Sequence, residues 1–309
     1  MPICRIMIGL PASGKDTYCN ELRPLGWVIN SSDDIRAELY GDANDQTHNG
    51  EIFNTMFRRT VAALSNNMDV VYNATNLSAK RRAGLITTLK TCKAVPVDTK
   101  YEAIVMATPY EECIKRNFVR ERVVPAYVMS SMLKRFQMPA KWEGFDEIKV
   151  YGNDNPNNVK ELLKIRSLCD RTNHDNHNHT LTVGHHMRKA HKLYNEIEVS
   201  KNYSVSQAIL YHDIAKPYCK TFLNSHGEPT DEAHYYGHEY ASAYIFLSLA
   251  AVANINGILR PCDELTVHLI QNHMAYFGGE TALNKIRERY GEDFVKKLDI
   301  VHKFDLLAH

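Results

Sequence analysis

A glycine-rich segment near the start of the chain carries the residue types that bind phosphate. Residues 9–16 (GLPASGKD) follow the apolar run Ile3–Ile8 and precede a helical pattern over 17–22. Between a strand and a helix, backbone N–H groups of such a turn surround a phosphate, and the helix N-terminus adds positive potential. We therefore expect a nucleotide site, with the Lys15 ammonium at the β and γ phosphates. The binding residues would be Gly9, Pro11, Ala12, Ser13, Gly14, Lys15, Asp16 and Thr17.

Asp16 occupies the position where this pattern usually has the Ser or Thr that helps to hold Mg²⁺. A carboxylate in the first turn of a helix interacts favourably with the helix dipole, and it can ligate Mg²⁺ directly or through water. The same carboxylate can repel a triphosphate. Thr17 replaces it poorly, because one residue along a helix is a rotation of about 100°. Both readings of Asp16 stay open at this stage.

A pair of acidic residues follows the second predicted strand. Asp33 and Asp34 come directly after Ser31 and Ser32, which can cap a helix. A hydroxyl that attacks a phosphoryl group needs a carboxylate within hydrogen-bond reach to take its proton. The sequence supports this role and plain helix capping equally.

Two arginines further along the chain could clamp a phosphate chain. Arg116 and Arg120 are four residues apart, so they lie on one face if the helix continues through both. Arginines in such a lid neutralise the charge on a transferred phosphoryl group. The alternative is a salt-bridged surface helix with Glu111, Glu112 and Glu121. The basic run Lys80-Arg81-Arg82 is expected to be a solvated helix face.

Histidines concentrate in the second half, where 14 of the 15 follow position 170. His179, the adjacent pair His212-Asp213 and the distant Asp305 combine imidazoles with carboxylates. This donor set suits Zn, Mn, Fe or another transition ion, and it leaves coordination positions for water and substrate. We expect His185, His186 and His234 only around the site.

The sequence predicts two domains of different class, 1–152 and 153–309. The boundary is placed there because residues 152–158 (GNDNPNN) form a cluster of turn residues. Before it, strand candidates at 3–8, 27–30, 70–72, 102–106 and 148–151 alternate with helices, which indicates a parallel α/β sheet. After it, helical periodicity over 187–197, 206–212, 239–253 and 263–273 indicates an all-helical domain.

Composition excludes several classes of protein. The chain has 309 residues, a formal net charge of +1, 44% hydrophobic residues and no apolar run of membrane-spanning length. Because no such run is present, we expect no membrane span. The seven cysteines are scattered without a CxxC pair, so we expect neither a disulfide framework nor a structural zinc site, and a cytoplasmic location. Because the net charge is near zero, any contact with nucleic acid must be local.

The motifs of the first half, taken in order, resemble the 5′-kinase domain of phage polynucleotide kinase-phosphatases. The resemblance covers about residues 1–150 and rests on GLPASGK at 9–15, DDIR at 33–36, ATNL at 74–77 with Arg81-Arg82, and Lys115-Arg116-Asn117 before Val124-Pro125. It implies that ATP with Mg²⁺ phosphorylates a polynucleotide 5′-hydroxyl. Asp33 would be the general base, Arg36 would contact the acceptor phosphate, Lys15 the β phosphate, and Arg116 and Arg120 the γ region. Asp16 and Ala74 depart from the family pattern, which usually has an acid at 74.

The second half resembles the HD-domain metal-dependent phosphohydrolases over about residues 170–309. The resemblance rests on His179, then His212-Asp213 with Lys216, then Asp305. It implies a helical domain in which His179, His212, Asp213 and Asp305 hold a divalent metal (Mn²⁺, Zn²⁺, Fe²⁺, Ni²⁺ or Co²⁺). His238 and His273 match the positions that supply a second ion, and Lys216 would contact phosphoryl oxygens.

Together the resemblances imply a bifunctional enzyme that processes RNA or DNA ends, phage-like and acting in the cytoplasm. The first domain would be a 5′-hydroxyl kinase, and the second a 3′/2′-phosphatase or cyclic phosphodiesterase. One alternative is a small-molecule or nucleoside kinase fused to a nucleotide phosphohydrolase. Another is a helical half that only binds partners and keeps a vestigial metal site. The preference for RNA or DNA and the oligomeric state stay open.

Overall fold

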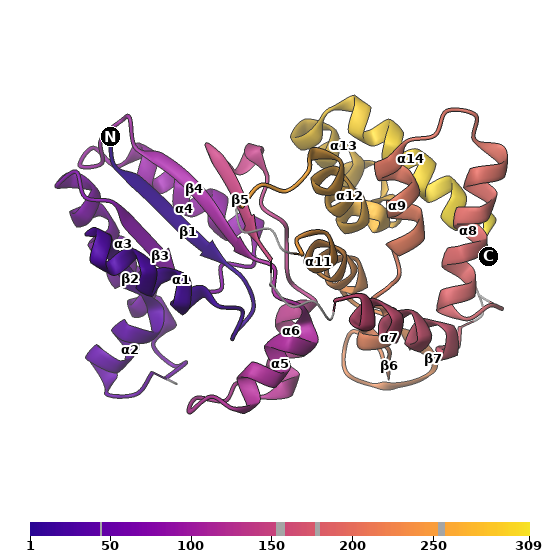
Figure 1. Cartoon of the computed structure of the whole chain (residues 1–309), viewed down its shortest axis with the longest axis horizontal. Helices are drawn as coiled ribbons and strands as arrows, with labels where there is room; N and C mark the ends of the chain where they lie inside the picture. The colour runs from indigo at the N-terminus through magenta and orange to yellow at the C-terminus, as the bar shows by residue number, and fades with distance from the viewer. Residues whose placement is uncertain (44, 153–157, 177–179, 253–256) are drawn as a thin grey trace. The chain divides into compact units, whose positions relative to one another are not determined.

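The computed structural model describes residues 1–43, 45–152, 158–176, 180–252 and 257–309, and these form two compact units (Figure 1). The first unit contains Met1–Met129 and Pro139–Gly152, together with Gly257 and Ile258. The second contains Ser130–Met138, the remaining described residues up to 252, and Leu259–His309. The assignment of functional domains to 1–152 and 153–309 stays a prediction.

The first unit is built on a five-stranded parallel sheet with the strand order β2-β3-β1-β4-β5. Its strands lie within two residues of the predicted ranges. The parallel α/β fold of the first half is therefore confirmed. The strands are rich in β-branched residues because both faces of a parallel sheet are covered. Their bounds are β1 (Ile3–Ile8), β2 (Val28–Ser31), β3 (Val70–Asn73), β4 (Lys100–Met106) and β5 (Glu147–Tyr151).

Helices flank this sheet, as Figure 1 shows in indigo to magenta. Cys19 and Leu22 of α1 pack in one buried cluster with side chains from three strands, Met7, Val71 and Ile104. This packing holds α1 against one face of the sheet. The helices are α1 (Lys15–Leu22), η1 (Arg23–Leu25), α2 (Ser32–Tyr40), α3 (Asn49–Ser65), α4 (Ala79–Thr91), α5 (Tyr110–Phe118), α6 (Ala126–Leu133) and η2 (Lys141–Glu143).

The prediction that the basic run lies on a solvated face of α4 is wrong for Arg82, which is buried, although Lys80 and Arg81 are exposed. The Arg82 side chain is 1% exposed and forms a two-pronged ion pair with Glu143, with Nε–Oε2 at 2.7 Å and Nη2–Oε1 at 2.8 Å. Arg82 Nη1 also donates to the carbonyl of Asn76 at 2.8 Å. The burial of Arg82 depends on a carboxylate far along the chain, which local periodicity does not reveal.

The described residues of the second unit are mainly helical, as predicted, and they include one hairpin that the sequence did not predict. Strands β6 (Thr221–Leu223) and β7 (Pro229–His234) pair antiparallel. Asn224 closes the turn between them, because its Oδ1 accepts from the backbone N–H of His226 and Glu228 at 2.9 and 3.0 Å. The strands are short and mostly polar, so they carry no alternating pattern that predicts them.

The four helical ranges predicted for the second half correspond to α8, α9, α11 and α12 to within four residues, and the other helices of this unit were not predicted. None of the described helices has the length and hydropathy of a membrane span. The helices are α7 (Asn158–Arg171), α8 (Val183–Ile197), α9 (Tyr203–Tyr211), α10 (Lys216–Cys219), α11 (His238–Ala250), α12 (Pro261–Asn272), η3 (His273–Gly278), α13 (Gly279–Tyr290) and α14 (Glu292–Leu307).

Candidate phosphate-binding and metal-binding sites

The phosphate-binding loop, residues 9–16, joins β1 to α1 in a conformation that few sequences adopt. Ala12 and Gly14 have left-handed backbones, with φ of 60° and 99°. A Cβ atom on Gly9 would lie 2.7 Å from Ser13 Oγ and 3.1 Å from the carbonyl oxygen of Met106. Glycine is therefore required at position 9 by close packing and favoured at position 14 by its φ.

The loop is held from both sides by neighbouring strands. The N–H of Gly9 donates to the carbonyl of Thr75 at 3.1 Å, and the Thr108 hydroxyl donates to the carbonyl of Ser13 at 2.8 Å. Both partners follow strands at the same edge of the sheet, β3 and β4 respectively. The anion-binding backbone is therefore formed before any phosphate arrives.

Lys15 lies within the phosphate-binding loop and contacts its carbonyl groups. Its Nζ donates to the carbonyls of Leu10 and Gly9 at 2.7 and 3.2 Å. Burial lowers the pKa of the Lys15 ammonium, while the nearby carboxylates Asp16 and Asp33 act in the opposite direction. A phosphate oxygen that enters the loop would take over from these carbonyls as partner of the ammonium.

Asp16 has a partner that the sequence did not indicate. Its Oδ1 accepts from Asn73 Nδ2 at 2.9 Å, and its Oδ2 lies 3.9 Å from Arg120 Nη2. Asn73 ends β3, beside Ala74, where the resemblance leads one to expect an acid. The carboxylate at this edge of the site therefore comes from the loop, and the amide from the strand orients it.

Asp33 lies between two arginines. Arg36 Nη1 is 2.8 Å from its Oδ1, and Arg122 Nη1 is 2.6 Å from its Oδ2. Arg36 is buried and also donates to Asn49 Oδ1 at 2.8 Å. Sequence reasoning missed Arg122, although it is the next arginine after Arg116 and Arg120. The structure thus brings Asp33 and Arg36 together and adds a further guanidinium.

Arg116 and Arg120 were expected to share one face if the helix continued through both. It does not, because α5 ends at Phe118. The Asn117 side chain closes the following turn by donating to the carbonyl of Val124 at 2.8 Å and accepting from its N–H at 2.9 Å. Arg116 Nε donates to Glu112 Oε1 at 3.0 Å. Arg120 therefore reaches Asp16 from a turn rather than from the face of a helix.

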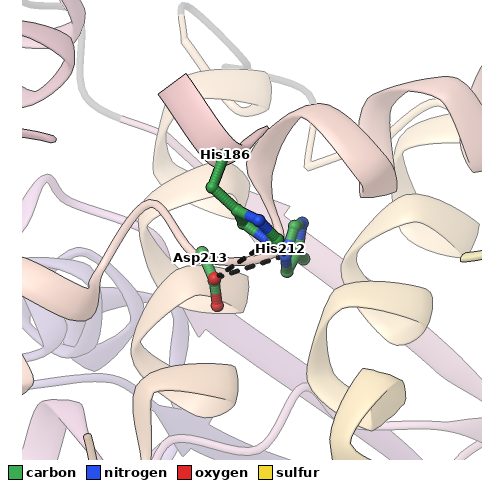
Figure 2. Close-up of side chains that lie close together, drawn as sticks. All are labelled: His186, His212 and Asp213. Carbon is green, nitrogen blue, oxygen red and sulfur yellow. Dashed lines mark hydrogen bonds and ion pairs between the residues drawn. The ribbon is translucent and has the colours of Figure 1, made fainter. Parts of the chain in front are cut away.

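Four side chains of the second unit bring donor atoms together in its interior, three of them drawn in Figure 2. His186 Nε2 lies 3.3 Å from His212 Nε2 and 2.9 Å from Asp305 Oδ1. His212 Nε2 lies 3.3 Å from both Asp213 Oδ2 and Asp305 Oδ1. Donor atoms around a tetrahedral metal with bonds of about 2.1 Å are about 3.4 Å apart. The spacing therefore fits one cation at the centre of this group.

A second group of donors shares Asp213. His238 Nε2 and His273 Nε2 lie 3.2 and 3.8 Å from Asp213 Oδ1, and 3.2 Å from each other. One carboxylate oxygen of Asp213 thus faces each group. We call the six residues the His/Asp cluster: His186, His212, Asp213, His238, His273 and Asp305.

Backbone carbonyls orient three of the imidazoles. The Nδ1 atoms of His212, His238 and His273 lie 2.7–2.9 Å from the carbonyl oxygen three residues earlier. If each Nδ1–H donates to its carbonyl, each Nε2 turns a lone pair toward the cluster. Each of these histidines stands at the end or the start of a helix, where that carbonyl is available. Such outer hydrogen bonds fix the tautomer of metal-binding histidines.

Charge is unevenly distributed over the cluster. Burial by itself lowers the pKa of His212, but the negative charges of Asp213 and Asp305 outweigh it and raise that pKa to about 10. Burial, with His238 and His212 nearby, lowers the pKa of His273 to about 3. The two donor groups therefore differ: the carboxylates at His212 favour positive charge there, whereas the imidazole of His273 is held neutral.

The predicted ligands His212, Asp213, His238, His273 and Asp305 come together, whereas His179 lies outside the described residues. Sequence reasoning placed His186 only near the site, but it lies in the cluster. In the structure, Thr182 caps α8 and contacts His185, which leaves His186 on the buried face. Lys216 Nζ lies 2.7 Å from Asp213 Oδ2, at the edge of the cluster.

Comparison with known proteins bears on the first unit. Residues 5–139 match a family model described as an AAA domain. No curated protein matches the chain. Among the solved structures similar to it, a chain of a Pnkp1/Rnl/Hen1 complex is 25% identical, with a TM-score of 0.33 over 40% of this chain and 41% of that one. A fungal RNA kinase is 19% identical, with a TM-score of 0.36 over 53% of this chain and 43% of that one. A gluconokinase from Sinorhizobium meliloti 1021 is 15% identical, with a TM-score of 0.34 over 53% of this chain and 88% of that one.

The chain spans about two fifths of the length of the first of these relatives. The matched segment 5–139 contains the phosphate-binding loop, most of β1, and all of β2, β3 and β4. The family match, the parallel sheet and the loop together support a P-loop domain with the fold of the P-loop kinases in the first unit.

Proposed function

We propose that this chain is a bifunctional enzyme that processes nucleic-acid ends. The first unit would transfer the γ-phosphoryl group of ATP to a polynucleotide 5′-hydroxyl. The second would be an HD-type metal-dependent phosphohydrolase that removes a 3′ or 2′ phosphate or opens a cyclic one. The observation that carries the proposal is the presence, in one chain, of a preformed phosphate-binding loop and a buried His/Asp cluster. A strand broken to a 5′-hydroxyl and a 3′-phosphorylated end needs both reactions before it can be ligated.

In the kinase reaction, the acceptor hydroxyl oxygen bonds to the γ phosphorus while the bond from that phosphorus to the β,γ-bridging oxygen breaks. Asp33 accepts the proton of the hydroxyl, and Arg36 contacts the acceptor phosphate. Lys15 neutralises charge on the β and γ phosphates, and ADP leaves. Arg120 contacts the γ region from its turn, as does Arg116 from α5. Asp16, whose Oδ1 accepts from Asn73, would hold the Mg²⁺ that accompanies ATP.

The donor set of the His/Asp cluster fits transition ions such as Mn²⁺, Zn²⁺, Fe²⁺, Ni²⁺ or Co²⁺. Buried Nε2 atoms lie 3.2–3.3 Å apart in two pairs, and a bound cation would accept a lone pair from each of them. His186, His212 and Asp305 would hold one ion, His238 and His273 another, and Asp213 both. When bound, such ions lower the pKa of a water molecule and polarise a phosphate. Lys216 lies at the edge of the cluster, within reach of phosphoryl oxygens.

A labelling experiment tests the kinase. The intact protein, incubated with γ-³²P-labelled ATP and Mg²⁺, should label a 5′-hydroxyl oligonucleotide, and Lys15→Ala and Asp33→Ala should abolish the label. Asp213→Ala is the matched control and should label as the wild type does. Absence of label with the wild-type protein would overturn this half of the proposal.

The same assay separates the polynucleotide kinase from the alternative, a nucleoside or small-molecule kinase. Labelling that falls steeply as salt increases indicates contacts to the phosphate backbone. Effective competition by free nucleosides, with little salt dependence, would favour the alternative.

A phosphatase panel tests the second unit. With Mn²⁺, the protein should act on at least one of three substrates: 3′-phosphate, 2′-phosphate or 2′,3′-cyclic phosphate ends. Asp213→Ala should lose that activity while Lys15→Ala keeps it. Hydrolysis of free nucleotides alone would point to a nucleotide phosphohydrolase. No hydrolysis and no bound transition metal would instead favour a binding module with a vestigial site.

A further inference from the structure

The candidate base Asp33 has a guanidinium on each of its carboxylate oxygens. Arg36 Nη1 lies 2.8 Å from Oδ1, and Arg122 Nη1 lies 2.6 Å from Oδ2. An acceptor hydroxyl has to come within about 2.6–3.2 Å of one of these oxygens to pass its proton to the carboxylate. In the ligand-free protein, an arginine therefore lies beside each oxygen that the hydroxyl could approach.

The two arginines differ in how firmly they are held. Arg36 belongs to α2, its side chain is 6% exposed, and its Nη2 also donates to Asn49 Oδ1 at 2.8 Å. Arg122 belongs to the turn between α5 and α6, and its side chain is 23% exposed. The Asp33 side chain is 46% exposed, so a substrate can reach it. Oδ2 is thus the oxygen open to exchange, and Arg122 is the group that has to move.

The turn between α5 and α6 places its arginines on two different carboxylates. Arg120 Nη2 lies 3.9 Å from Oδ2 of Asp16, in the first turn of the helix that follows the phosphate-binding loop. Arg122 instead contacts Asp33, in the first turn of α2. In the proposed kinase, Asp16 belongs to the nucleotide side of the site and Asp33 to the acceptor side. The contact of Arg122 therefore assigns it to the acceptor side.

A phosphate of the acceptor strand is a suitable new partner for Arg122. Guanidinium binds phosphate and carboxylate with the same forked N–H geometry. In a polynucleotide, the phosphate nearest to the 5′-hydroxyl links the terminal nucleoside to the next nucleotide, so it arrives together with that hydroxyl. It can take over the guanidinium of Arg122 while the hydroxyl takes its place at Oδ2 of Asp33.

We propose that Arg122 is a positioning residue that makes the kinase depend on a phosphate in its acceptor. In the ligand-free protein it occupies Oδ2 of Asp33; in the complex it binds the acceptor phosphate and leaves Oδ2 to the hydroxyl. The inference rests on the proposed kinase function, and it adds how the site distinguishes a polynucleotide end from a free nucleoside. A nucleoside would have to displace Arg122 without offering it a new partner.

Binding is measured first, because it needs no phosphoryl transfer. A 5′-hydroxyl oligonucleotide with a fluorophore at its 3′ end is titrated with the protein in the absence of ATP, and its anisotropy is followed at several salt concentrations. Arg122→Gln should weaken binding about three- to tenfold, because the lost phosphate contact is offset in part by the contact with Asp33 that no longer has to be broken. The slope of log K against log salt should fall by about 0.7, the value for one phosphate contact on a single strand.

Two variants control the binding experiment. Arg122→Lys keeps the positive charge and should keep the salt slope. Arg59→Gln is the matched control, because Arg59 pairs with Glu38 on the surface of the same unit, and it should change neither the affinity nor the slope. An Arg122→Gln slope equal to that of the wild type would overturn the phosphate contact.

Kinetics then test the choice between acceptors. A dinucleoside monophosphate is compared with the free nucleoside, because its internal phosphodiester is not a terminal phosphate that the proposed phosphatase would remove. The wild type should have the higher kcat/KM for the dinucleotide, and Arg122→Gln should reduce the ratio of the two values about three- to tenfold. The variant should act on the nucleoside no less than the wild type does, since Oδ2 of Asp33 is then open, and KM for ATP should be unchanged. A variant that only distorts the site would lower the values for both acceptors alike.

The outcomes separate this inference from the kinase itself. If the wild type phosphorylates the dinucleotide but Arg122→Gln leaves the ratio unchanged, or lowers both values equally, the role of Arg122 is overturned and the kinase stands. A raised KM for ATP with an unchanged ratio would assign Arg122 to the nucleotide instead. If the wild type phosphorylates neither acceptor, the kinase and the role of Arg122 are overturned together.

Discussion

Replacing Glu143 by Gln removes the charge that compensates Arg82 in the interior of the first unit. Both side chains are almost fully buried, and two hydrogen bonds of 2.7 and 2.8 Å join them. Glu143 Oε1 also accepts from the N–H of Ala140 at 3.1 Å. Arg82 binds the carbonyl of Asn76, whose own side chain donates to the carbonyl of Met7 in β1 at 2.7 Å. The pair therefore ties α4 and η2 to the segment beside the phosphate-binding loop.

The magnitude follows from burial. Removing one partner of a buried ion pair typically costs about 3–5 kcal/mol, because the other charge is left uncompensated. For a unit of this size, each kcal/mol shifts the melting temperature by about 2–4 °C, so the expected decrease is about 6–20 °C. Replacing both residues by Met should cost less, about 2 kcal/mol, because it removes the hydrogen bonds to the carbonyl of Asn76 and from the N–H of Ala140 but leaves no buried charge.

Tryptophan fluorescence follows this unit selectively, because both tryptophans, Trp27 and Trp142, belong to it. Glu147→Gln is the matched control: Glu147 pairs with Lys149 at 3.0 Å but is 54% exposed, so its loss should cost less than about 1 kcal/mol. A Glu143→Gln transition no lower than that of the control would refute the reasoning. So would a double Met variant as unstable as the single one.

Three further predictions concern the two sites. Asn117→Ala removes both side-chain bonds to Val124, so the turn that carries Arg120 should loosen; we expect kcat for phosphoryl transfer to fall about tenfold with little change in ATP affinity, and a fall in affinity alone would contradict this. Asp213→Asn should lose both metal ions, since Asp213 faces both donor groups, whereas Asp305→Asn should lose mainly one; metal analysis of the purified variants distinguishes them. Chelation of the metal should destabilise the second unit and lower the melting temperature of its far-ultraviolet circular dichroism signal. The expected loss is about 3–4 kcal/mol for each bound ion if free metal was present at 100–1,000 times its Kd. The tryptophan transition should not move.

Local patterns were enough to predict the sheet and the phosphate-binding loop. Hydrophobic periodicity and the φ preference of glycine depend on neighbouring residues alone. They therefore indicate the backbone conformation at the β-branched runs 3–8 and 70–73 and at the glycines 9 and 14. The ligands His212, Asp213 and Asp305 were found only because the resemblance supplied their distant pairing. Spacing along the chain does not reveal that residues 92 positions apart meet.

What the sequence did not reveal depends on long-range partners or on side-chain geometry. Arg82 reads as a surface residue until Glu143, 61 residues later, is brought beside it. The end of α5 follows from Asn117 bonding to Val124. His185 and His186 are adjacent, and the sequence does not show which of them faces inward; the residue at which α8 begins determines this.

One oligonucleotide tests the central claim that two independent phosphate chemistries share this chain. An RNA with a 5′-hydroxyl and a 3′-phosphate is incubated with the protein, ATP, Mg²⁺ and Mn²⁺, and chromatography resolves its four possible end states. The wild type should give a 5′-phosphate with a 3′-hydroxyl. Lys15→Ala should change only the 3′ end, and Asp213→Ala only the 5′ end. If either single variant blocked both ends, or if the wild type left both unchanged, the claim would be contradicted.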